Sequence, residues 1–240
     1  MVPPPLSDWV LPSLTESSFA TQPLFGSPYP LVAQPESAAL WVLLGAVWLA
    51  MGGHLLRIVI LEHESRKDAA QPGDGREVPS TLERPTDQVI LSAALVAAAI
   101  WPWLADASSV MGLLGAAVMA VLAILAALGD TRHRRAHPPR NSVGLFAGWA
   151  VVALYASFAG LVVGDLGLSS ALAIIVSVLL LLATAIEVQL RLGPRVGFSL
   201  AIICAMIGFA SQSLGVDLTA TLVAIVAITA IATVMVRVLS

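Results

Sequence analysis

The stretch that decides the fold is Asn141–Gly167, NSVGLFAGWAVVALYASFAGLVVGDLG. From Ser142 to Gly164 it holds no charged residue over 23 positions. As an α-helix these positions extend over about 35 Å, which is enough to cross the roughly 30 Å hydrocarbon core of a bilayer. We therefore predict a membrane-spanning helix here, and the remainder of the chain repeats the pattern.

Small residues recur at every fourth position of this stretch, with Val152 as the one interruption. A small-residue face lets another helix backbone come close, and close approach drives helix association in lipid, where burial of apolar surface gives little advantage. We predict a helix-packing face made of Gly144, Gly148, Ala156, Gly160 and Gly164.

The composition predicts that lipid is the solvent for most of the chain. Of the 240 residues, 58% are hydrophobic and 11% are charged, and the mean hydropathy is +0.90. Soluble proteins are typically about 25% charged. The single cysteine, Cys204, excludes an intrachain disulfide and a thiolate metal cluster, and we predict that it packs as a small hydrophobic residue.

The chain divides into a tail and an all-α transmembrane bundle. Residues 1–36 contain eight prolines, which predicts an extended extracytoplasmic tail. No Lys or Arg precedes Arg57, so we expect no signal peptide. Residues 37–240 form the predicted bundle, with a cytoplasmic loop at 61–88. Seven apolar runs are predicted to span: Ser37–Ile60, Val89–Ala105, Val110–Gly129, Ser142–Gly164, Ser170–Gln189, Val196–Ser213 and Leu218–Val238.

The charges predict how the bundle is oriented. All 12 Lys and Arg residues lie at the end of the first run or in the loop after it, between the third and fourth runs, between the fifth and sixth, or at the C-terminus. The other connections carry only acids: Asp106, Asp165 and Asp217. With seven spans these two sets fall on opposite sides, and the basic side is expected to be cytoplasmic. The N-terminus is therefore predicted outside and the C-terminus inside.

Four segments together resemble the TspO/MBR-related, tryptophan-rich sensory membrane proteins. They are Leu145–Phe158 (LFAGWAVVALYASF), Ile90–Met119 (ILSAALVAAAIWPWLADASSVMGLLGAAVM), Phe198–Ala210 (FSLAIICAMIGFA) and Ser27–Trp48 (SPYPLVAQPESAALWVLLGAVW). The resemblance implies a multi-pass helical bundle without catalysis that acts as a sensor or carrier. It further implies a hydrophobic or tetrapyrrole ligand: haem, a porphyrin or a bacteriochlorophyll precursor.

The aromatic residues supply the candidate ligand site. A flat apolar ligand would stack in a cleft between the first, second and fourth predicted spans, with Trp48 nearest the middle of the membrane. The same aromatic residues could instead anchor the helix ends at the membrane interface and fill the core. The candidate residues are Trp41, Trp48, His54, Trp101, Trp103, Trp149 and Tyr155.

The titratable residues give little indication of chemistry. His54 is the only histidine within a predicted span; it could ligate a haem metal, or lie at the interface near Arg57. Glu187 and Arg191 have the spacing of a local ion pair on a helix. No catalytic set, nucleotide-binding loop or metal-ligand spacing is present in the sequence, so we expect no enzyme activity, no metal site and no nucleic-acid partner.

An alternative function is that of an accessory, structural or assembly subunit in a larger bacterial membrane complex, respiratory or photosynthetic. The Ala, Gly and Ser content of the spans suits contact with other membrane subunits or a homodimer, and an ordered N-terminal tail would add to such contact. Both functions place the protein in the bacterial cytoplasmic (inner) membrane as a multi-pass protein in contact with lipid.

The predicted orientation can be tested by labelling intact cells. A protease applied from the periplasm, or a thiol reagent applied to a variant with a cysteine introduced there, is expected not to reach the turn at residues 132–140, because its four arginines place it on the cytoplasmic side. Labelling of that turn from outside would show that the span count or the orientation is wrong.

Overall fold

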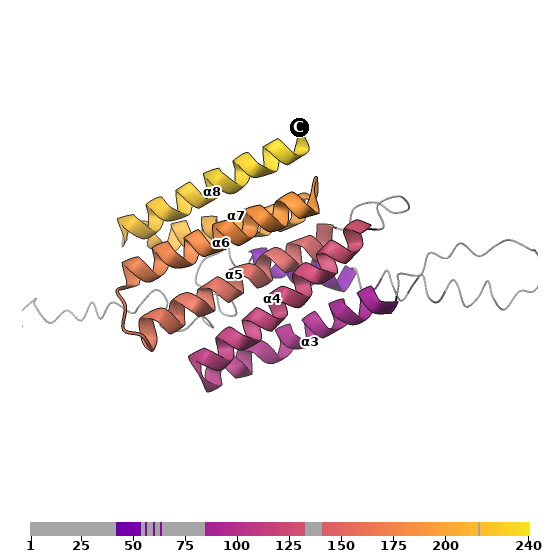
Figure 1. Cartoon of the computed structure of the whole chain (residues 1–240), viewed down its shortest axis with the longest axis horizontal. Helices are drawn as coiled ribbons and strands as arrows, with labels where there is room; N and C mark the ends of the chain where they lie inside the picture. The colour runs from indigo at the N-terminus through magenta and orange to yellow at the C-terminus, as the bar shows by residue number, and fades with distance from the viewer. Residues whose placement is uncertain are drawn as a thin grey trace, which may run out of the picture.

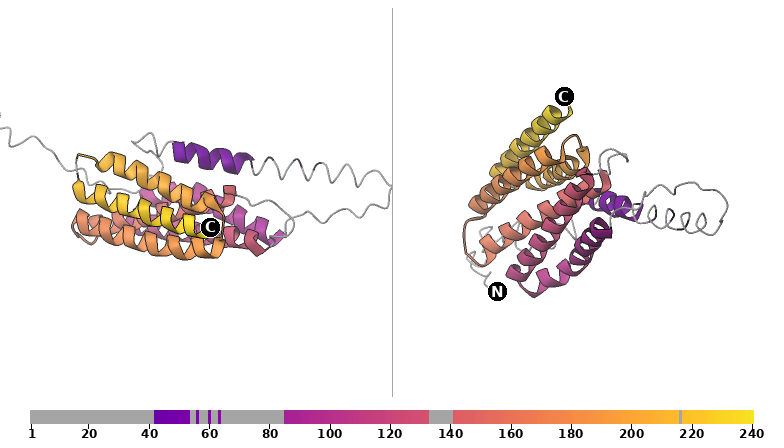
Figure 2. Two further views of the ribbon diagram at one scale, coloured as in Figure 1. Left: turned by 90° about the horizontal axis from the view of Figure 1, so that it is seen from above. Right: turned by 45° about the vertical axis from the view of Figure 1, so that its right-hand side comes forward.

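The computed structural model describes residues 42–53, 56, 60, 63, 85–132, 141–215 and 217–240. Six long helices make up most of this part, joined by short connections. Their bounds are α3 Pro85–Ala107, α4 Ser109–Arg132, α5 Asn141–Gly164, α6 Ser170–Leu192, α7 Val196–Ser213 and α8 Leu218–Leu239. A shorter apolar helix, Val42–Gly53, lies alongside them (Figure 2).

All six long helices are long and apolar enough to cross a membrane. They coincide with the second to seventh predicted spans, so the prediction of an all-helical, multi-pass membrane bundle is confirmed for this part of the chain. Of the first predicted span, Ser37–Ile60, only Val42–Gly53 is described as a continuous helix, and it is too short to cross a bilayer alone. The count of seven spans and the orientation in the membrane therefore stay predictions.

Four of the helices close into a ring. Helix α5 contacts α6 and α7, and α8 contacts the same two helices from the other side. The remaining pair, α3 and α4, forms an antiparallel hairpin that joins the ring through contact between α4 and α5 (Figure 1). The bundle thus consists of a four-helix unit with a helical hairpin on one flank.

Helix α5 is the centre of the bundle, as the length and small residues of its sequence predict. In the apolar segment of α5, 72% of the residues are buried, compared with 17% in the apolar segments of α3 and α8. Three consecutive residues, Val151, Val152 and Ala153, are all buried, so neighbours cover α5 on every side. Helices α3 and α8 bury one side and expose the other, as expected of helices at the lipid boundary.

The close contact between α5 and α7 depends on glycine. A Cβ atom on Gly148 would lie 2.5 Å from the Phe198 carbonyl oxygen and 2.8 Å from the Ala201 Cβ. One turn earlier, a Cβ on Gly144 would lie 3.2 Å from the Phe198 amide nitrogen. Reciprocally, Gly197 at the start of α7 lies directly against the Asn141 carbonyl of α5. The two backbones therefore touch over the first two turns of both helices.

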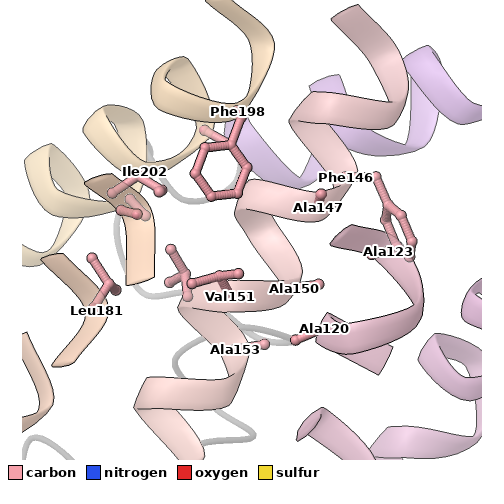
Figure 3. Close-up of a cluster of buried hydrophobic side chains, with 14 of the residues drawn as sticks. Ala120, Ala123, Phe146, Ala147, Ala150, Val151, Ala153, Leu181, Phe198 and Ile202 are labelled. Atoms are coloured by element: carbon pink, nitrogen blue, oxygen red, sulfur yellow. The ribbon is translucent and has the colours of Figure 1, made fainter. Parts of the chain in front are cut away.

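The predicted packing face is used unevenly along α5. Ala156 and Gly160 are buried, whereas Gly164 is exposed and has nothing within 4 Å of its Cβ position. Gly164 therefore takes no part in a close helix contact, because α5 ends there. A second small-residue contact lies on another side of α5, where Ala150 and Ala153 face Ala120 of α4 (Figure 3).

The arginines of the described helices and turns lie at one end of the bundle, and three aspartates lie at the other. Asp106 in the last turn of α3, Asp165 after α5 and Asp217 before α8 lie at the end that holds the α3–α4, α5–α6 and α7–α8 connections. Arg195, in the turn between α6 and α7, and Arg237, in the last turn of α8, lie at the opposite end (Figure 1). Successive described helices run in opposite directions. Connections that alternate along the chain between aspartate and arginine therefore lie at opposite ends of the bundle.

Replacing Gly148 tests the α5–α7 contact. Gly148→Ala is expected to destabilise the bundle by about 1–3 kcal/mol, because the new methyl group overlaps the Phe198 carbonyl and forces the helices apart. Thermal unfolding in detergent micelles measures the effect. Gly164→Ala is the matched control and should leave stability unchanged, since its Cβ position is open. Equal stability of the two variants would contradict a backbone contact at Gly148.

Candidate functional site

The predicted aromatic site does not come together as one cleft among the described residues. Trp41 and the His54 side chain lie outside them. Trp48 and Trp103 face outward, with 64% and 70% of their surfaces exposed. Trp101, by contrast, is 1% exposed. The tryptophans thus divide between the outer surface and the core.

Trp101 is held in the hairpin by a hydrogen bond and by glycines. Its indole Nε1 donates to the Gly112 carbonyl of α4 at 3.0 Å. A Cβ on Gly112 would lie 2.9 Å from the Ala105 Cα, and a Cβ on Gly115 would lie 3.4 Å from the Trp101 ring. The two glycines therefore let α3 approach α4 closely enough for the indole to reach the carbonyl, which removes the cost of burying an unpaired donor.

The indole of Trp101 also reaches Trp149 on α5. Their ring centroids lie 6.2 Å apart with the planes at 90°, an edge-to-face contact. Trp149 in turn stacks against Phe146, one turn earlier on its own helix, at 5.9 Å and 25°. We name Trp101, Phe146 and Trp149 the aromatic cluster. It connects α3 to α5 beside α4, which offers Ala116 and Ala120 as small buried residues nearby.

Tyr155 contributes to a separate contact. Its hydroxyl lies 2.5 Å from the Thr184 hydroxyl of α6, with either oxygen as the donor. This hydrogen bond joins α5 to α6, whereas the aromatic cluster joins α5 to the α3–α4 hairpin. Of the candidate site residues that the structure describes, only Trp101 and Trp149 touch each other.

A buried polar cluster at the α6–α7 turn was not predicted from the sequence. Gln189 is 1% exposed, and its Nε2 donates to the carbonyls of Gly193 at 2.8 Å and Arg195 at 3.1 Å. Its Oε1 accepts from the Ser199 hydroxyl at 2.7 Å. One side chain thus pairs two turn carbonyls and ties the last turn of α6 to the first turn of α7.

The turn has a conformation that explains the need for Gln189. Gly193 has a positive φ of 68°, which glycine adopts without a steric penalty. The Arg195 amide then donates back to the Gly193 carbonyl at 2.7 Å. The buried Arg195 begins α7 without a side-chain cap. A glutamine four residues before a glycine turn is the sequence signal that could have indicated this cluster.

Most other buried hydroxyls are also paired inside the bundle. The hydroxyls of Ser213 of α7 and Thr221 of α8 lie 3.0 Å apart, so that one donates to the other while the second donates to a backbone carbonyl one turn earlier. Ser157 donates to the Ala153 carbonyl at 2.8 Å. Within the described residues, the Ser177 hydroxyl is the one buried side-chain group that has no hydrogen-bond partner.

The predicted ion pair of Glu187 and Arg191 is confirmed, but it lies at the surface. The Arg191 Nε donates to a Glu187 carboxylate oxygen at 2.7 Å, and the Arg191 and Glu187 side chains are 65% and 60% exposed. An exposed pair of this kind contributes about 0–1 kcal/mol. Among the described residues, no group of three or more His, Cys, Asp or Glu side chains could hold a metal ion.

The fold and these contacts define a multi-pass helical membrane protein whose aromatic and buried polar side chains mostly connect its own helices. No family model, no curated protein and no solved structure matches the chain. The class of the protein therefore rests on the helices and their contacts.

Replacing Trp101 tests the role of the aromatic cluster. Trp101→Phe is expected to lower the free energy of unfolding by about 1–3 kcal/mol, because the Gly112 carbonyl loses its indole donor and a smaller ring leaves space in the core. Thermal unfolding in micelles measures the loss. Trp103→Phe, at an outward-facing position in the same turn, should cost less than about 0.5 kcal/mol. An equal loss in both variants would argue against a specific core role for Trp101.

Replacing Gln189 tests the polar cluster at the α6–α7 turn. Gln189→Leu has a similar volume but leaves the Ser199 hydroxyl and two turn carbonyls without their partner, so a loss of about 1–3 kcal/mol is expected. The control is Arg191→Gln, which removes only the exposed ion pair two residues away. If the control destabilised the protein as much as Gln189→Leu, the buried network would not explain the effect.

Proposed function

We propose that this protein is a non-catalytic subunit of a larger assembly in the bacterial cytoplasmic membrane, where it contributes structure through its helix faces. The observation that supports the proposal is that large buried polar side chains form hydrogen bonds within the protein. Trp101 and Gln189, two large buried side chains with hydrogen-bonding groups, both bond to the chain itself. Such an interior holds helices in place.

The outer surface offers wide faces for contact with other membrane proteins. In α3 and in α8 only 17% of the residues of the apolar segment are buried, so most of the apolar surface of these two helices faces away from the bundle. In α8 the outward Thr229 and Thr233 hydroxyls donate to the carbonyls one turn earlier, which satisfies them within the helix. The α8 face can therefore meet either lipid or another apolar helix with these two hydroxyls already paired.

A TspO-like sensor or carrier for a hydrophobic ligand, including a tetrapyrrole, is the second candidate. The observation in its favour is the outward exposure of Trp48 and Trp103, because an exposed indole can stack on a flat molecule taken from the bilayer. The aromatic cluster supports the first candidate better, since Trp101 is fully buried against its own neighbours.

The orientation that we propose follows the charges. The end with Arg195 and Arg237 faces the cytoplasm, and the end with Asp106, Asp165 and Asp217 faces the extracytoplasmic side of the membrane. In this orientation the C-terminus is cytoplasmic.

Co-purification tests the assembly proposal. The full chain with a C-terminal tag, extracted in a mild detergent or a native lipid nanodisc, is expected to bring a reproducible set of membrane proteins, identified by mass spectrometry after cross-linking. Val226→Trp on α8 and Val96→Trp on α3 add bulk to outward positions that are 62% and 57% exposed. One of the two variants should lose at least tenfold of the captured partner while unfolding at the same temperature as the unmodified protein.

Capture of the protein alone, with and without cross-linking, would refute the assembly proposal. A parallel titration of the purified protein with haem or protoporphyrin then tests the second candidate through quenching of tryptophan fluorescence. Saturable quenching that is weakened by Trp48→Leu or Trp103→Leu favours ligand binding. Quenching that neither substitution changes, or no saturable quenching, counts against it.

A further inference from the structure

We draw no further inference here: the strongest candidate, the outward face of the Val42–Gly53 helix, where Gly45, Gly52 and Gly53 have nothing within 4 Å of their Cβ positions, is a stripe of small residues on an unpartnered apolar helix, and nothing in the structure shows what covers it.

Discussion

The backbone contact between α5 and α7 is the constraint on which the rest of the bundle depends. Lipid offers apolar helices no gain for leaving it, so helices stay together when their surfaces fit closely enough to exchange dispersion contacts. Gly144, Gly148 and Gly197 remove the side chains that would otherwise hold the two helices apart. Phe198 then lies fully buried between α5 and its own helix, and Val151 and Ile202 fill the next layer (Figure 3).

The other helices are placed by their relation to this pair. Helix α6 contacts α5, and α8 completes the ring by contacting both α6 and α7. The α3–α4 hairpin repeats the same principle on the opposite flank, where Gly112 and Gly115 bring α3 within reach of α4. Trp101 extends the hairpin's contact to Trp149 and so links it to the central helix. Hydrogen bonds support these contacts at the α6–α7 turn and between α7 and α8.

This distribution of side chains bears on function. Polar and ionisable groups inside a membrane are costly, and proteins that move ions or substrates keep them near the middle of their spans. Here the buried glutamine and most of the buried hydroxyls of the described helices are paired with the chain's own backbone or with each other. The described ion pair of Glu187 and Arg191 lies at the surface near a helix end. Because most of these buried polar groups are paired within the chain, we propose a structural role within an assembly.

The helices could be predicted from the amino-acid pattern alone. Long apolar runs with few charges predict helices that cross a bilayer, because lipid offers the backbone of such a run no other hydrogen-bond partners, and the runs coincide with α3 to α8. The amino-acid pattern also predicted that α5 is central and that the arginines of the described helices lie at one end. Which side chains meet could not be predicted in this way, because it depends on how the helices pack. Trp101 and Trp103 are two residues apart and equally aromatic, yet one is buried and one exposed, because the neighbouring helix covers only one side of α3. Gly148 and Gly164 likewise look equivalent in the sequence, but α7 passes beside only the first, and no local pattern specifies where a neighbouring helix will lie.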